Sequence, residues 1–446
     1  MKYSYISVLI LVIFLISCNQ DDNQILKPAL NQAITVYEND HFEDDYILIT
    51  PMRQDTTYLI DRTGKLQQSW SNEGDEVLMA YLMKDGSVVR SIFTNADNGI
   101  NIPGKTGKLQ IIDKNNALVW EWQLDNSTQA LHHDIALLPN GNILASVWEV
   151  IDFNLCVEAG RDPNKLFDNR LVIDKVIEIQ PAGNNQANII WEWSLWDHII
   201  QDFDVNRSNY GDIADHPELF DVNLGAGGEN YTHVNSLNYI TEFDQIIINS
   251  RTLNEFFIID HSTSTEEART SLGGTYGKGG DILFRWGNPV NFKTGNSNDR
   301  KITGQHDASF FKSNGQFENF LVFDNLDNVE YSTVKAINVN ISEIGNYPSI
   351  LDIGNIPSNV SWEYSSNSIL SKLTSGCQRL RNGNILITST AGNIIREVTM
   401  DKRVVWEYDF NQESTDEQDF KMYSNGFKTR SLSINYSGIQ SLNLQN

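Results

Sequence analysis

The stretch LHHDIALLPNGNIL, residues 131–144, carries the pattern that decides the fold. Apolar residues recur through its first half, an Asn-Gly pair follows, and a second apolar run starts directly after that pair. Asn-Gly favours a type I′ turn, because both central residues of that turn need positive φ, and such turns join antiparallel strands. The stretch therefore predicts a β-hairpin with two histidines near the start of its first strand.

Hairpins of this kind recur along the chain. KDGSVV (84–89), FDQIIINS (243–250) and RNGNILIT (381–388) each place a turn before an apolar strand. A tryptophan then marks the end of each of six units, at Trp70, Trp122, Trp193, Trp286, Trp362 and Trp406. A period of roughly 40–80 residues with about four strands per unit predicts an all-β, six-bladed β-propeller, in which the tryptophans pack between blades.

The propeller is expected over residues 45–446. Its first unit starts directly at YILITP (46–51) and lacks a clear innermost strand, whereas SLSINYSG (431–438) is strand-like and unassigned. We predict that this last stretch or its neighbourhood pairs with the first blade, because closing the ring removes exposed sheet edges. An irregular insertion, residues 194–230, interrupts the repeat and is expected on one rim, where it would shape the mouth of a site.

Residues 1–17 have the features of an export signal. An apolar run from Ile6 to Ile16 follows a lysine and is too short to span a membrane. A serine then precedes Cys18, as in lipoprotein signal peptides, so cleavage would make Cys18 the lipidated first residue. Residues 18–44 would form the lipid anchor and tether. An ordinary signal peptide with an incidental cysteine, or a short anchor, is the alternative.

The lipoprotein interpretation sets an expected location. We expect an exported lipoprotein of the outer membrane that faces the periplasm or the cell surface and touches the membrane through its lipid anchor only. The acidic NQDD after Cys18 resembles the signal of surface-exposed lipoproteins. In an oxidising compartment Cys156 and Cys377 could form a disulfide, although the sequence does not show that they are close.

The charge balance argues against one class of partner. The chain has 58 acidic and 33 basic residues, a formal net charge of −25, and no block of Lys or Arg. Such a protein repels a phosphate backbone, so we expect no nucleic-acid partner. An anionic small substrate would need a local basic pocket. The oligomeric state is left open by the sequence.

Three histidines lie at similar points of consecutive units. They are His133, His233 in THVNSLNYI (232–240) and His306 in GQHDASFF (304–311). We assign them to the innermost strands of blades three, four and five, where equivalent ends lie close together. The three imidazoles are therefore expected to face one small volume.

The neighbouring His132 is an alternative to His133. In a regular strand the two side chains point to opposite faces. We favour His133, because Asp134 follows it as Asp307 follows His306. The other histidines occur in tether, insertion or strand-end contexts and are predicted to be non-catalytic: His41, His198, His216 and His261.

Arg251 ends the IIINSR run of the fourth unit. An arginine on a buried strand is costly unless it meets an anion. It either pairs with a carboxylate such as Glu255 or faces the histidines and clamps a phosphate or sulfate group. A histidine cluster by itself permits a metal site or nucleophilic group transfer, whereas a neighbouring arginine favours an anionic group over a cation.

Several segments in the same order resemble one known family. HHDI with PNGN, THVNS with IIINSR, EFFIIDHST followed by GKGGDILFRWGNP, GQHDA, and QRLRNGNILIT with REVTMDKRVVWEY together resemble the bacterial arylsulfate sulfotransferases. The similarity runs from about residue 45 to the C-terminus and implies a six-bladed propeller. The family moves a sulfuryl group from a phenolic sulfate ester to another phenol, without a nucleotide donor, a metal or an organic cofactor.

The resemblance also implies roles for individual residues. His306 matches the family nucleophile, which becomes transiently sulfated. His133 (or His132) and His233 match the supporting histidines, and Arg251 matches the family arginine; these residues would bind the substrate. The alternatives are a non-catalytic, surface-anchored propeller that binds glycans or peptides, a metal-dependent propeller hydrolase, and a sulfatase that uses water as the acceptor.

Overall fold

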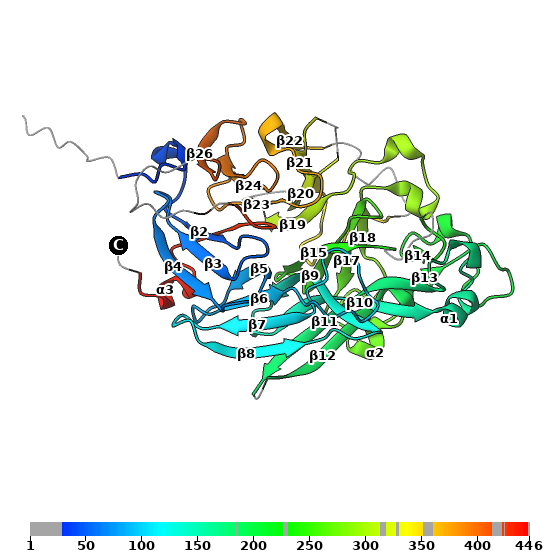
Figure 1. Cartoon of the computed structure of the whole chain (residues 1–446). Helices are drawn as coiled ribbons and strands as arrows, with labels where there is room; N and C mark the ends of the chain where they lie inside the picture. Colours follow the sequence, from blue (N-terminus) through cyan, green and yellow to red (C-terminus); the bar gives the residue numbers. More distant parts are fainter. Residues whose placement is uncertain are drawn as a thin grey trace, which may run out of the picture.

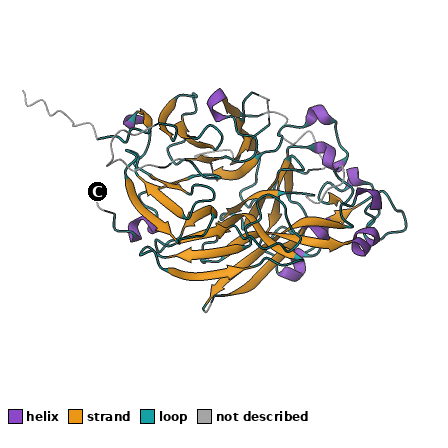
Figure 2. Cartoon of the chain, viewed as in Figure 1, coloured by secondary structure: helices purple, strands orange, loops and turns teal. Residues whose placement is uncertain are grey.

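Six antiparallel sheets follow one another around a common centre in the computed structural model (Figure 1). The structure describes residues 29–183, 185–225, 231–312, 318–326, 330–350, 360–412, 422 and 424–444. The predicted signal peptide and Cys18 lie outside these residues. Helices are few and short, and they lie around the sheets (Figure 2).

Each sheet is one blade, named here from its innermost to its outermost strand. Blades one to three comprise β27 (Arg430–Leu432), β2 (Tyr46–Ile49), β3 (Thr56–Ile60) and β4 (Leu66–Ser71); β5 (Val77–Leu82), β6 (Val88–Ile92), β7 (Lys108–Ile112) and β8 (Leu118–Gln123); and β9 (Gln129–Leu137), β10 (Ile143–Asp152), β11 (Arg170–Ala182) and β12 (Gln186–Ser194).

Blades four to six continue the same order. They comprise β15 (Val234–Ile240), β16 (Gln245–Ser250), β17 (Glu255–Asp260) and β18 (Phe284–Trp286); β19 (His306–Lys312), β20 (Glu318–Asp324), β21 (Thr333–Val339) and β22 (Trp362–Ser365); and β23 (Gly376–Arg379), β24 (Ile385–Ser389), β25 (Ile394–Val398), β26 (Val404–Asp409) and β1 (Ile34–Tyr37).

The remaining elements lie in the connections. They are the parallel pair β13 (Ile199–Ile200) and β14 (Phe220–Asp221), the helices α1 (Phe153–Glu158), α2 (Thr265–Ala268) and α3 (Ser437–Ser441), and short 3₁₀ turns at Asn39–His41, Pro163–Lys165, Leu195–His198, Ile213–Asp215, Pro289–Phe292, Ser297–Asp299 and Asn367–Ile369.

The predicted six-bladed, all-β propeller is confirmed. Innermost strands of successive blades contact one another, β5 with β9, β9 with β15, β15 with β19, and β19 with β23. Figure 1 shows these strands gathered around the middle of the molecule. The predicted closure is also confirmed, because β27 pairs with β2 and supplies the innermost strand of blade one. The stretch 431–438 is only partly strand, since α3 begins within it.

The N-terminal segment also takes part in the fold. β1 lies inside the stretch that the sequence assigned to the tether, yet it pairs with β26 as a fifth strand of blade six. Closure therefore uses both ends of the described chain, one at each of two neighbouring blades. Covering the outer edge of β26 removes another row of unpaired backbone groups.

The hairpin at residues 131–144 is present, but its predicted turn type is wrong. Gly141 N–H donates to Leu138 O, and Leu138 N–H donates to Asn142 O. Within the loop, residues 138–142, only Gly141 has positive φ, at 91°. Pro139 holds φ near −65° at the first central position, which is incompatible with a type I′ turn. The loop instead has the geometry of a type I turn followed by a glycine bulge.

The tryptophans pack between blades as predicted, and five of their indoles also bind across the blade boundaries. Each of these indole N–H groups donates to a backbone carbonyl of the next blade: Trp70 to Gly86, Trp120 to Gln186, Trp193 to Gly280, Trp362 to Met400, and Trp406 to Arg62. Trp120 performs this role in blade two, in place of the predicted Trp122. The repeat therefore encodes a polar contact as well as an apolar one.

The described part of the insertion after β12, up to residue 225, lies at the end of the ring where the innermost strands begin. This placement follows from the alternating strand directions within a blade. The segment between β10 and β11, which contains α1, lies at the same end. The predicted rim position of the insertion is thus confirmed, and the three histidines share that end of the channel.

Candidate active site

The innermost strands β9, β15 and β19 are irregular at their histidines. Their pairing shifts register opposite Ala145–Val147, between Val234 and Ser236, and between His306 and Ser309. The backbone is left-handed at the corresponding positions, with φ of 46° at His133, 47° at His233 and 56° at Asp307. Such a conformation costs roughly 1–3 kcal/mol for a residue with a side chain, and bulges of this kind re-aim side chains near sites.

The backbone also corrects the expected equivalence of the three histidines. His133, His233 and Asp307 share the left-handed position, so His306 lies one residue earlier in its strand. The bulge in β19 between His306 and Ser309 compensates for this one-residue offset. The imidazole of His306 therefore still points toward the same region as those of His133 and His233. Their relative exposures are only 4% for His133, 7% for His233 and 1% for His306.

His133 contacts both His233 and Phe427, and Phe427 in turn contacts His306. The His133 and His233 ring centroids are 4.6 Å apart. Phe427, from the segment that leads into β27, lies 5.6 Å from the His306 ring and 6.2 Å from the His133 ring. The predicted convergence of His133, His233 and His306 is therefore present in the structure.

Burial keeps these imidazoles uncharged. It lowers the pKa of His306 to about 3 and that of His233 to about 4, and it places the pKa of His133 well below the ordinary value. Neighbouring imidazoles and the Arg251 cation lower the His133 pKa further, because they disfavour another positive charge. Neutral imidazoles have a lone pair available for nucleophilic attack.

Arg251 supplies the positive charge of the cluster. Its backbone N–H donates to the carbonyl of His233 at 3.0 Å, in the turn between β16 and β17. The side chain is partly buried, and burial lowers its pKa. Within the described part of the chain, no residue forms an ion pair or hydrogen bond with its guanidinium. The alternative partner Glu255 is bound to Arg285 instead, with Nε to Oε2 at 3.0 Å.

His132 lies behind His133. Its ring stacks on Trp148 with centroids 4.2 Å apart, and its Nδ1 is 3.0 Å from Nδ1 of His133. The expectation of opposite faces fails because the strand is bulged at this point. His133 is the member of the pair that contacts His233 and Phe427, whereas His132 contacts Asp174.

Asn325, which the sequence did not indicate as a site residue, contacts the candidate nucleophile His306. Asn325 Oδ1 lies 2.7 Å from Nδ1 of His306. Its amide nitrogen donates to the carbonyls of Ser371 at 2.7 Å and Thr374 at 2.6 Å, which fixes the orientation of the side chain. No motif marks an asparagine that follows a strand, so only the folded contact reveals it.

A charged network closes the channel beneath the histidines. Lys428 Nζ lies 2.5 Å from Asp134 and 3.2 Å from Asp307, and Arg430 binds Asp307 with both terminal nitrogens, at 2.6 and 3.0 Å. Burial would raise the pKa of Asp307, but Arg430 and Lys428 outweigh it and hold that pKa at about 2. The two aspartates that follow His133 and His306 thus share one lysine.

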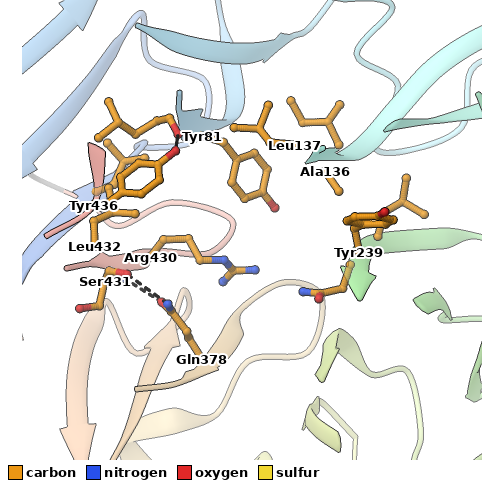
Figure 3. A pocket seen from close by; sticks show the side chains of 14 residues that line it. Tyr81, Ala136, Leu137, Tyr239, Gln378, Arg430, Ser431, Leu432 and Tyr436 are labelled. Atoms are coloured by element: carbon orange, nitrogen blue, oxygen red, sulfur yellow. Dashed lines mark hydrogen bonds between the residues drawn. The ribbon is translucent and has the colours of Figure 1, made fainter. Parts of the chain in front are cut away.

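The opposite end of the channel holds a separate pocket of about 270 Å³ (Figure 3). It is lined by the far ends of the innermost strands, including Leu82, Leu137 and Tyr239. Tyr81 and Arg430 point into it and also belong to the charged network. The three histidines do not line this pocket, because the network lies between the two ends.

The remaining histidines and cysteines occupy other environments. His198 binds Asp281, His216 binds Glu218, and His261 binds Asp244 and Glu178. Cys156 and Cys377 are both buried and free, so the disulfide alternative is wrong. Across the residues that the structure describes, no group of three or more His, Cys, Asp or Glu is arranged to hold a metal ion. None of the helices in that part of the chain is long and apolar enough to cross a membrane.

The sequence matches one family model, described as Arylsulfotransferase (ASST), over residues 32–430. The chain belongs to the arylsulfotransferase family. The resemblance deduced from the sequence motifs is thereby confirmed, and the match covers the cluster of His133, His233, His306 and Arg251. No curated protein matches this chain.

Solved structures similar to this chain share little sequence with it. A Bacteroides caccae protein of unknown function is 11% identical with a TM-score of 0.45, covering 87% of this chain and 99% of its own. Virginiamycin B lyase from Staphylococcus aureus is 12% identical with a TM-score of 0.37, covering 85% and 89%. The Pseudomonas aeruginosa periplasmic gluconolactonase is 8% identical with a TM-score of 0.39, covering 87% and 99%. At these scores the likenesses carry no argument about the reaction.

Proposed function

We propose that this family member moves a sulfuryl group from a phenolic sulfate ester to a phenolic acceptor through a sulfohistidine at His306. The observation that carries the proposal is the contact between His306 and Asn325. The amide nitrogen of Asn325 is committed to two carbonyls, so its oxygen faces Nδ1 of His306 and must accept a hydrogen from it. This neutral tautomer leaves the lone pair on Nε2, which has no hydrogen-bond partner among the described residues.

The charge of the cluster supports an anionic substrate. Three neutral imidazoles and one guanidinium carry a total of one positive charge, which matches the single negative charge of an aryl sulfate monoester. Arg251 has no carboxylate partner within the described residues, so its two-pronged guanidinium is available to sulfonate oxygens. Binding these oxygens in a buried site stabilises the charge that they carry in the transition state.

The reaction proceeds in two steps. In the first, Nε2 of His306 attacks sulfur in line, the N–S bond forms, and the S–O bond to the aryl group breaks as its electron pair moves to the phenolic oxygen. In the second, an acceptor phenol attacks the sulfur of sulfo-His306, and the N–S electron pair returns to Nε2. Neither step requires a nucleotide, a metal or an organic cofactor.

Replacement of His306 tests the proposal. The chromogenic substrate 4-nitrophenyl sulfate releases a coloured phenol, and a phenol is added as the acceptor. His306→Ala is expected to lower turnover by about 10³-fold or more, because the covalent route is lost. The matched control is His261→Gln, since His261 is a partly buried histidine between Asp244 and Glu178, away from the cluster.

The intermediate and the acceptor give further readouts. Rapid quenching with donor alone should trap a labile SO₃ adduct on a peptide that contains His306. Phenol release that is unchanged by an added acceptor would identify a sulfatase instead. Full activity of His306→Ala would remove the nucleophile, and loss of activity with a chelator, restored by metal, would favour the metal-dependent hydrolase. Absence of turnover for all aryl sulfates would favour the non-catalytic binding propeller.

We also propose that the chain is an exported lipoprotein anchored through Cys18. The support is the apolar run and cysteine of the first 18 residues. Metabolic labelling with palmitate should mark the wild-type chain and leave Cys18→Ala unlabelled and released from the membrane fraction. Labelled Cys18→Ala protein would contradict the anchor.

A further inference from the structure

His132 connects the site to a buried carboxylate. Its Nδ1 is 3.0 Å from Nδ1 of His133, and its Nε2 is 2.9 Å from Oδ1 of Asp174. His132 Nε2 and Asp174 Oδ1 are both buried and have no hydrogen-bond partner of good geometry in the described chain, so their 2.9 Å ion contact is the polar contact that each makes. The ring is held in place by the stack on Trp148, with an interplanar angle of 5°.

The carboxylate of Asp174 is itself fixed as an acceptor. Its second oxygen accepts from the Thr232 hydroxyl and, at 3.2 Å, from the Val234 backbone N–H. Asp174 lies on β11, whereas Thr232 and Val234 flank His233 in the next blade. Asp174 is 1% exposed and His132 is 2% exposed. The whole chain of contacts is therefore shielded from water.

The hydrogens along this chain can be placed by elimination. An ionised carboxylate can only accept, so its 2.9 Å contact with Nε2 of His132 favours the tautomer that carries the hydrogen on that nitrogen. In the neutral ring, Nδ1 of His132 then has the lone pair and accepts a hydrogen from Nδ1 of His133. His133 thus presents Nε2 to the cluster, and a proton gained at that nitrogen is stabilised through His132 by the charge of Asp174.

We propose that Asp174, His132 and His133 form a proton relay, in which His133 protonates the departing phenolate and later accepts the proton of the attacking phenol. This inference rests on the proposed sulfuryl transfer and deepens it. His133 is the catalytic member, because it contacts the reacting groups. His132 and Asp174 are positioning residues that act through it. In this proposal His233 and Arg251 bind the sulfonate oxygens of the substrate.

The substrate charge makes the acid form of His133 accessible. Burial is the largest cause of the lowered pKa of His133, followed by His233, His132, His306 and Arg251. A bound sulfate ester places a negative charge among these groups and offsets the positive charge of Arg251. The ester anion and a proton on His133 are therefore expected to bind together.

The proton balance closes over both steps. In the first step Nε2–H of His133 gives its proton to the phenolic oxygen as the S–O bond breaks, and His133 becomes neutral. In the second step the acceptor O–H gives its proton to the same Nε2 as the new O–S bond forms. No external acid, base or redox partner is consumed.

Donor substrates with different leaving groups distinguish a proton relay from a purely structural role of Asp174 and His132. A poor leaving phenol needs protonation, whereas 4-nitrophenolate leaves with little help. Asp174→Asn and His132→Gln are expected to lower kcat/KM for phenyl sulfate roughly 10-fold to 100-fold more than for 4-nitrophenyl sulfate. A change that only loosens the fold lowers both substrates by the same factor.

Blade three and its neighbour offer a matched control for the assay. His261 and Glu178 form a second, partly buried pair of a histidine and a carboxylate, with Nε2 to Oε2 at 3.2 Å, further along β11. Glu178→Gln and His261→Gln are expected to keep the wild-type ratio between the two substrates. Equal losses for both substrates in Asp174→Asn, with an inactive His306→Ala, would overturn the relay and leave the proposed function standing. A wild-type protein without turnover of either ester would overturn the proposed function.

An independent readout reports the relay without turnover. In protein labelled with ¹⁵N at the histidine rings, His133 is expected to carry its hydrogen on Nδ1 and to show a hydrogen-bonded ring N–H. Asp174→Asn should shift the His132 and His133 signals and leave those of His261 unchanged, and His132→Gln identifies the signals. Unchanged ring signals in Asp174→Asn would contradict the relay.

Discussion

Two buried clusters share the central channel, and they treat charge in opposite ways. In the charged network, each of Asp134, Asp307, Lys428 and Arg430 has an oppositely charged partner. In the histidine cluster, three imidazoles are uncharged and Arg251 faces no carboxylate among the described residues. A buried ion that is paired has its charge satisfied within the fold and is costly to separate from its partner, whereas an unpaired one needs a ligand. The comparison assigns closure of the channel to the first cluster and anion binding to the second.

Removing the central cation of the network should give the largest effect on stability. Lys428→Met leaves two buried carboxylates without their shared partner, and we expect a loss of about 3–5 kcal/mol in the free energy of unfolding. Urea denaturation measures it. Activity per folded molecule should stay within a few-fold of the wild-type value. A variant that is as stable as the wild type but has lost activity would contradict the purely structural role of the charged network.

Removing the cation of the other cluster should have the converse effect. Arg251→Ala is expected to lower kcat/KM for an aryl sulfate by about 10²–10³-fold, comparable to the loss of one oxyanion donor. Its stability should change by no more than about 0.5 kcal/mol, because no ion pair is broken. A stability loss as large as that of Lys428→Met would show that Arg251 is structural.

Asn325→Ala tests whether Asn325 positions the imidazole of His306. Without the amide oxygen, Nδ1 of His306 no longer has to carry the hydrogen, so a fraction of the rings loses the nucleophilic lone pair at Nε2. We expect kcat to fall roughly 10-fold to 100-fold, with a smaller change in KM. A pre-steady-state burst of phenol measures the chemical step, and an unchanged burst rate would contradict the positioning role.

The smallest effects should appear in the pH dependence. His306 and His233 have pKa values of about 3 and 4 in the folded protein, below the ordinary value near 6.5. Unfolded chains therefore bind more protons below about pH 6.5, and stability decreases as the pH falls from there toward the folded values. His306→Ala should weaken this decrease, as followed by thermal denaturation between pH 7 and 4. An identical pH dependence in the variant would show that His306 is not held neutral.

The blades and four of the site residues could be predicted from the sequence, whereas Asn325 and Asp174 could not. The hairpin periodicity and the recurring tryptophans predicted six blades, since each unit has to cover its neighbour. The ends of the repeat predicted closure by the C-terminal strand. The motif order predicted the family and, with it, His133, His233, His306 and Arg251. Asn325 and Asp174 carried no such signal, because their partners lie in other strands or blades.

The blade count, the ring closure and the residue types at the site could be predicted from the amino-acid order, because they follow from local periodicity and recurring motifs. The tertiary structure decided how those residues act. A bulge in β9 brings the ring of His132 into contact with that of His133, although a regular strand would place the two side chains on opposite faces. Pairing of Glu255 with Arg285 left Arg251 for an anion, and Asn325 selected the tautomer of His306. These outcomes depend on contacts between distant segments, which only folding brings together.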